Sequence, residues 1–135
     1  GGYGDRDATA LDFLEEVGFE RDSSVPFKPA SVLPHGYLKR LELAQCLALR
    51  PDLVILDELF SGLSLAEVAS TVPIIEKLQA EGKALIMIEH RLRELFRIVD
   101  RVVVLNYGQI IASGTPKEVM ESDAVKRAYL GSEEG

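Results

Sequence analysis

Two neighbouring carboxylates, Asp57 and Glu58, directly follow the apolar run of residues 53–56. The run is typical of a strand buried on both faces, so both carboxylates are expected at its C-terminal end, where open parallel sheets place their ligand sites. The first carboxylate suits coordination of Mg²⁺, and the second suits orienting or deprotonating a water molecule that attacks a phosphate. Taken alone, such a pair is more often a solvated strand end than a catalytic pair.

A histidine follows the next apolar run along the chain. His90 stands two residues after the run of residues 84–88, which is also typical of a buried strand. A lone histidine at a strand end is ordinarily a surface residue. Its position two residues after a buried apolar strand favours instead a catalytic histidine.

The elements around these residues follow from apolar spacing, caps and turn residues. Helices are expected at residues 5–17, 36–50, 64–81 and 92–99, strands at 53–57, 84–89 and 101–106, and a last helical region after Thr115. Pro73 is expected to kink the third helix or shift its beginning. The pair Tyr107-Gly108 predicts a tight hairpin with an antiparallel edge strand. The order of strands and helices predicts an α/β fold with a mostly parallel sheet.

Composition narrows the class of protein. With 135 residues, 47% hydrophobic and 27% charged, the chain has the balance of a soluble globular domain. Its net charge of −7 and its scattered basic residues argue against a nucleic-acid partner. The apolar runs are too short to cross a bilayer, no leader pattern is present, and the single Cys46 is expected to be a buried small hydrophobe. These features predict a cytoplasmic protein.

Several motifs in order resemble those of ABC transporter ATPases. The segment Leu33-Pro34-His35-Gly36-Tyr37 and the helix after it resemble the signature loop, and Ser61-Gly62-Leu63-Ser64 resembles the D-loop. Ile88-Glu89-His90 resembles the switch-histidine segment. The Leu-Pro-x-Gly form, Arg40-Leu41-Glu42-Leu43-Ala44, and the tail at 107–119 and 128–131 are similar to the branched-chain amino-acid transport subfamily.

The resemblance implies a fold and a partner. The fold would be the C-terminal portion of a P-loop NTPase (RecA-like) core, with residues 1–50 in the helical subdomain and 51–135 in the ATPase core. ATP and Mg²⁺ would be the cofactors of the complete parent. The parent would import branched-chain amino acids, pair head to tail with a second ATPase subunit, and associate peripherally with the inner membrane through permease subunits.

The resemblance also implies roles for single residues. Asp57 would organise Mg²⁺ indirectly, Glu58 would polarise the attacking water, and His90 would contact the terminal phosphate. His35 fills a variable slot and is expected to be solvent-exposed, and Ser64 is also expected to cap its helix. The residues that would face ATP held by the partner subunit are Leu33, Pro34, His35, Gly36 and Tyr37 of the signature loop, with Ser61 and Ser64 of the D-loop.

The chain departs from the family in one large respect. A phosphate-binding loop reads Gly, four residues, Gly-Lys, then Ser or Thr, whereas the only Gly-Lys pair, Gly82-Lys83, has Lys77 in place of the first glycine and is followed by Ala84. The chain alone is therefore expected to bind no nucleotide and to be inactive. Tyr37 and Leu59 replace a usual glutamine and proline, which leaves the activity of the parent open.

The missing loop also affects folding. The strand that leads to it normally separates the strands at 84–89 and 101–106, so these two strands are expected to pair in a new arrangement or to exchange between the chains of a dimer. Two other functions remain: a non-catalytic interaction or oligomerisation module, and a fragment of a DNA-repair or chromosome-structure ATPase. The acidic charge and the transporter-like tail argue against the last.

Overall fold

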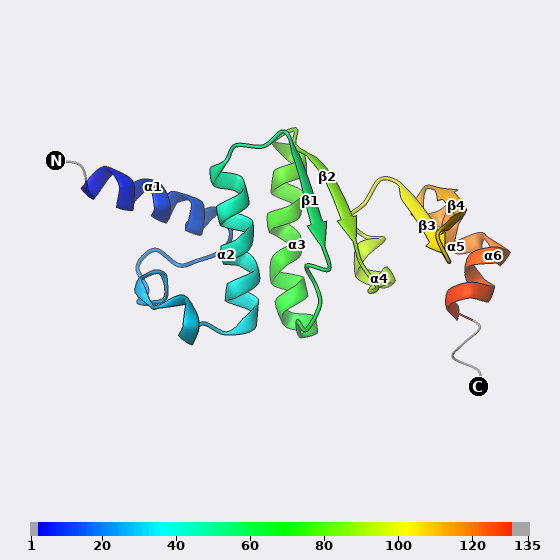
Figure 1. The fold of residues 1–135 in the computed structure, drawn as a ribbon, viewed down its shortest axis with the longest axis horizontal. Coiled ribbons are helices and arrows are strands. Elements are labelled where there is room, and N and C mark those ends of the chain that lie inside the picture. Colours follow the sequence, from blue (N-terminus) through cyan, green and yellow to red (C-terminus); the bar gives the residue numbers. More distant parts are fainter. Residues whose placement is uncertain (1–2, 131–135) are drawn as a thin grey trace. The chain divides into compact units, whose positions relative to one another are not determined.

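The computed structural model describes residues 3–130 and divides the chain into two compact units, Gly1–His90 and Arg91–Gly135 (Figure 1). The first unit contains helices α1 (Tyr3–Glu16), α2 (His35–Ala48) and α3 (Leu65–Ala80) and strands β1 (Leu53–Asp57) and β2 (Ala84–Ile88). The second contains helices α4 (Leu92–Leu95), α5 (Pro116–Glu121) and α6 (Asp123–Val125) and strands β3 (Val102–Asn106) and β4 (Gln109–Gly114). The expected boundary at residue 50 lies inside the first unit and stays a prediction about subdomains.

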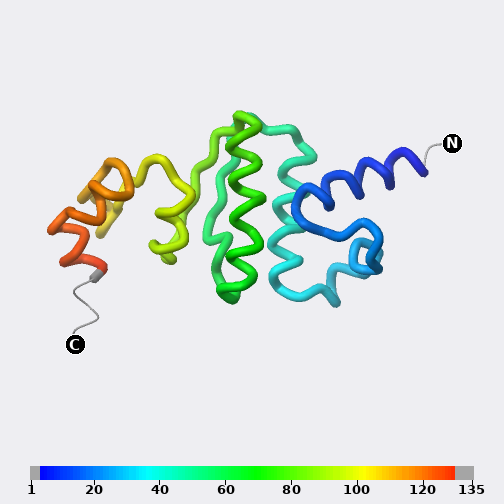
Figure 2. The backbone as a smooth tube through the Cα atoms, turned by 180° about the vertical axis from the view of Figure 1, so that it is seen from behind, coloured from blue at the N-terminus to red at the C-terminus, as the bar shows by residue number. Residues whose placement is uncertain are grey.

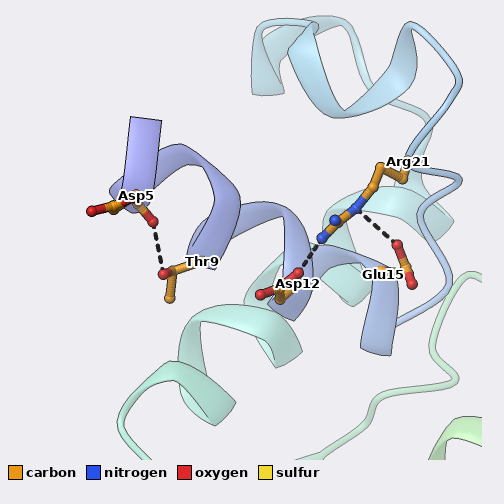
Figure 3. Close-up of polar contacts among 5 residues, drawn as sticks. All are labelled: Asp5, Thr9, Asp12, Glu15 and Arg21. Atoms are coloured by element: carbon orange, nitrogen blue, oxygen red, sulfur yellow. Dashed lines mark hydrogen bonds and ion pairs between the residues drawn. The ribbon is translucent and has the colours of Figure 1, made fainter. Parts of the chain in front are cut away.

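Helix α1 packs against α2, and an irregular segment joins them (Figure 2). Arg21 of this segment forms ion pairs with Asp12 and Glu15 of α1, the second at 3.0 Å between Nε and Oε2 (Figure 3). On the same helix the Thr9 hydroxyl donates to the Asp5 carbonyl at 2.8 Å. Since the ion pairs of Arg21 are exposed, they contribute little to the stability of the fold.

Strands β1 and β2 form a parallel pair in which Leu53 lies opposite Ala84 and Asp57 opposite Ile88. This confirms the predicted parallel pairing. Val54 and Leu56 are buried. Helix α3 runs alongside both strands in Figures 1 and 2. The expectation that β1 is buried on both faces is wrong, because Leu53 is 48% exposed and Ile55 61% exposed on the opposite face. That face is largely exposed, although Ile55 lines a small cavity with residues of α2.

Helix α3 begins where the sequence predicts. The Ser64 hydroxyl accepts a hydrogen bond from the Glu67 backbone at 3.2 Å, and Ser64 is the N-cap residue. The helix continues through Pro73, so the expected shift of its beginning is wrong, and the alternative, a kink at Pro73, stays a prediction. It ends at Ala80, two residues before Gly82, whose φ of 84° is a left-handed conformation that glycine adopts at no steric cost.

The second unit is a hairpin packed on short helices. β3 and β4 are antiparallel, and Tyr107 and Gly108 have φ angles of 48° and 75°, as the two central residues of a type I′ turn require. Thr115 and Glu118 form the predicted capping box of α5. A buried cluster holds the unit together: Val102, Val104, Val119 and Val125.

One expectation about the later elements needs correction. Helix α4 spans Leu92–Leu95 rather than 92–99. The strands form two separate pairs, β1–β2 and β3–β4. The new arrangement expected for residues 84–89 and 101–106, like an exchange between the chains of a dimer, remains a prediction.

Candidate functional site

Glu58 and His90 meet at the C-terminal edge of the β1–β2 pair. Glu58 directly follows β1, and its backbone N–H donates to the Ile88 carbonyl at 2.8 Å, which extends the ladder by one bond. His90 Nε2 lies 2.7 Å from Glu58 Oε1. The His90 side chain is 81% exposed and that of Glu58 46%, so the pair is accessible from solvent. A carboxylate held by an imidazole in this way can orient a water molecule or accept its proton.

Glu58 also has an unusual backbone. Its φ of 55° lies in the left-handed region, which disfavours residues with a side chain. The turn that follows is closed by the Ser61 N–H, which donates to the Glu58 carbonyl at 3.1 Å. The conformation is therefore maintained by specific contacts on both sides of the residue.

Asp57, the last residue of β1, is exposed beside this pair. It lines a small cavity of about 150 Å³ with Lys39 and Glu42 of α2. Within residues 3–130 no group of three or more acidic, histidine or cysteine side chains could hold a metal ion. Mg²⁺ commonly binds through one or two carboxylates and the phosphates of its substrate, so one accessible strand-end carboxylate fits this ion when a nucleotide completes the shell.

Sequence reasoning assigned no role to Glu89, which the structure places in the same cluster. Its Oε1 accepts a hydrogen bond from the Phe60 backbone N–H at 3.0 Å. Burial raises the pKa of the Glu89 carboxyl, the charge of Glu58 adds to the rise, and the hydrogen bonds from the Phe60 and Leu59 backbone oppose it. The only signal in the sequence was its position between the apolar run of residues 84–88 and His90.

The signature-like and D-loop-like segments touch within this one chain. His35 Nε2 lies 3.0 Å from the Ser61 carbonyl oxygen. A Cβ on Gly62, whose φ is 74°, would lie 3.0 Å from the same nitrogen, and a Cβ on Gly36 would lie 2.6 Å from Glu67 Oε2. His35 is exposed as expected, but it has a partner that sequence reasoning missed.

Tyr37 occupies a packed position rather than an open one. Its ring meets Phe19 edge to face, with centroids 5.1 Å apart, and the Arg40 guanidinium lies 5.6 Å from the Tyr37 ring centroid. Its proposed contact with nucleotide stays a prediction. The remaining residues of the two loops have these environments: Leu33 is half-buried, Pro34 is exposed and precedes α2, Ser61 is exposed, and Ser64 caps α3.

Comparison with known proteins identifies the family. The lipopolysaccharide export system ATP-binding protein LptB of Escherichia coli (strain K12) is 34% identical over 130 residues, which cover 95% of this chain and 52% of LptB. The crystal structure of the ADP conformation of an ATP-binding cassette of an ABC transporter matches with a TM-score of 0.78 and 28% identity, over 90% of this chain and 48% of that one. The chain belongs to the ABC transporter ATP-binding family.

Two further findings concern the type of ABC transporter. The family model described as "Branched-chain amino acid ATP-binding cassette transporter" matches residues 109–135. The high-affinity branched-chain amino acid transport ATP-binding protein BraF of Pseudomonas aeruginosa is 35% identical over 123 residues, or 90% of this chain and 47% of BraF. The ABC relatives thus include both an export and an amino-acid transport protein, and the chain spans about half the length of each.

The match to an ABC ATP-binding cassette confirms the predicted fold class, an α/β fold of the P-loop NTPase type, and the portion of that core which the chain forms stays a prediction. It also supports nucleotide binding in the complete relatives, since one structural neighbour is an ADP form. No helix within residues 3–130 has the length and apolar composition to span a bilayer.

Proposed function

We propose that this chain supplies the water-activating and signature elements of an ABC ATPase subunit that drives import of branched-chain amino acids. The observation that carries the proposal is the 2.7 Å contact between Glu58 Oε1 and His90 Nε2 at the carboxyl ends of two parallel strands. The match of residues 109–135 and the similarity to BraF support the branched-chain type, whereas the similarity to LptB supports only the ATPase.

In this proposal, side chains at one edge of the sheet have separate roles. Glu58 orients the attacking water and takes up its proton, and the exposed His90 side chain holds the Glu58 carboxylate in place. Asp57 would hold Mg²⁺, which when bound neutralises charge on the phosphates. The contact of His35 with Ser61 positions the signature loop against the D-loop, and Glu67 of α3 lies so near Gly36 that a side chain there would meet it.

The proposal assigns nucleotide binding to a larger assembly. No Gly-x-x-x-x-Gly-Lys-Ser/Thr pattern occurs in the 135 residues, so the phosphate loop would come from a polypeptide segment outside them. A second ATPase subunit would face the signature loop. The complete subunit would be cytoplasmic and would attach to the inner membrane through permease subunits.

The test compares the isolated chain with the complete subunit that contains it. The isolated chain should show no Mg²⁺-dependent ATP hydrolysis, and the complete subunit should show it. Glu58→Gln in the complete subunit should lower kcat by about 10²- to 10⁴-fold, because Gln cannot accept the proton. Glu76→Gln, an exposed change on α3, is the matched control and should leave kcat unchanged. A Glu58→Gln subunit with wild-type turnover would refute the proposal.

A non-catalytic interaction module is the second candidate. The observation that favours it is the largely exposed face of the β1–β2 pair, on which Leu53, Ile55, Ile86 and Ile88 are 48–61% exposed. Such an apolar face favours burial against another polypeptide. Under this function the purified chain would bind a complete ATPase subunit. The ATP turnover of that complete subunit would not depend on Glu58 of the bound chain. A chain that stays monomeric in the presence of that subunit would contradict it.

A further inference from the structure

Three consecutive residues at the end of β2 each contact the turn that begins at Glu58. The Ile88 carbonyl accepts from the Glu58 N–H at 2.8 Å, and His90 Nε2 lies 2.7 Å from the Glu58 carboxylate. Between them, Glu89 Oε1 accepts from the Phe60 N–H at 3.0 Å. Glu89 is thus the side chain that binds the backbone of the turn, while its two neighbours bind Glu58 itself.

The turn that begins at Glu58 needs an acceptor for the Phe60 N–H. Glu58 has a left-handed φ of 55°, which costs free energy for a residue with a side chain. Leu59 and Phe60, which follow it, are buried at 6% and 0% exposure. A buried N–H without an acceptor is strongly unfavourable, so losing the Glu89 carboxylate would favour a different path of the backbone.

The geometry points to Glu89 as a positioning residue for Glu58. Its carboxylate is half-buried and engaged by the backbone of the turn, so it acts on the backbone conformation that presents Glu58 to His90. The raised pKa caused by its burial agrees with a carboxylate that is turned inward. The inference rests on the proposed function for its effect on turnover, but not for its effect on the turn.

The substitution Glu89→Gln separates positioning from charge. Gln keeps an amide oxygen that can accept the Phe60 N–H, whereas Glu89→Ala removes the acceptor and Glu89→Asp retracts it by one methylene. A purely structural role would lower stability without changing the reaction. A positioning role would lower kcat at unchanged KM for ATP, and Gln would restore it.

Two measurements test the inference independently. In the 135-residue chain, amide hydrogen exchange of Phe60 should quicken by roughly tenfold in Glu89→Ala and stay slow in Glu89→Gln. In the complete subunit, Glu89→Ala should lower kcat by up to about 100-fold with KM for ATP unchanged, and Glu89→Gln should recover most of it. If Glu89→Ala fails to fold, Glu89→Asp takes its place, with the same expected direction in both measurements.

The outcomes are distinguishable. Unchanged exchange at Phe60 in Glu89→Ala would overturn the inference. So would faster exchange with wild-type kcat, because the contact would then be structural only. Absence of ATP hydrolysis by the wild-type complete subunit would refute the proposed function instead, and the exchange of Phe60 would still decide whether Glu89 holds the turn.

Discussion

The carboxyl end of the β1–β2 pair and the signature-like loop are built in different ways. At the strand ends, Ile88, Glu89 and His90 make three polar contacts with one turn, so Glu58 is held from its backbone and from its side chain. At the loop, His35 makes one exposed contact with Ser61, and Tyr37 packs against its own unit. The first region is preorganised within the chain, whereas the second has fewer polar contacts within the chain and, under the proposed function, faces the partner subunit.

The largest expected effect distinguishes the two histidines. In the complete subunit, His90→Ala should lower kcat by about 100-fold or more, because the Glu58 carboxylate loses the group that orients it. His35→Ala should change kcat by no more than about tenfold, as expected for one exposed hydrogen bond, and His35→Gln should retain the donor. Steady-state kinetics with saturating ATP measure both. Equal losses in the two variants would remove the distinction between the regions.

A smaller effect tests whether Tyr37 is part of the packing. Tyr37→Ala in the 135-residue chain should lower the free energy of unfolding by about 1–2 kcal/mol, because it removes the contacts with Phe19 and Arg40. Tyr37→Phe keeps the ring and should be close to neutral. Urea unfolding followed by circular dichroism measures both variants. A neutral Tyr37→Ala would mean that the side chain is free to face a ligand.

The smallest effect concerns pH. Since burial raises the pKa of Glu89 in the folded chain, the folded state binds more protons than the unfolded state between the ordinary glutamate pKa, about 4.3, and the raised value. The stability contribution of this group should therefore fall as pH rises through that window. Urea unfolding across a pH series should show this decline in the wild type and a weaker one in Glu89→Gln. The same dependence of stability on pH in the wild type and in Glu89→Gln would contradict this expectation.

The strands, the hairpin and the helix caps could be predicted because their signals are local. Residues 53–57 carry an apolar run, Tyr107-Gly108 suits a type I′ turn, and Thr115 with Glu118 forms a capping box. The open face of β1 could not be predicted, since an apolar run does not tell which segment covers it. Ile55 shows this, being apolar, inside the strand and 61% exposed.

The candidate site was predictable in part for a similar reason. Glu58 and His90 follow two apolar runs, and parallel strands bring their carboxyl ends to one edge. The Glu89 contact spans 29 positions and depends on the register that sets Asp57 opposite Ile88, which the sequence alone does not specify. The His35 contact with Ser61 likewise requires the approach of α2 to the turn before α3.

A double-mutant cycle on Glu58 and His90 tests the central claim, that the two side chains act as one unit. The complete subunit would be measured as wild type, Glu58→Gln, His90→Ala and the double variant, with kcat as the readout. Residues that act together give non-additive losses, so the double variant should be close to Glu58→Gln alone. A double variant whose loss equals the product of the two single losses would contradict the account.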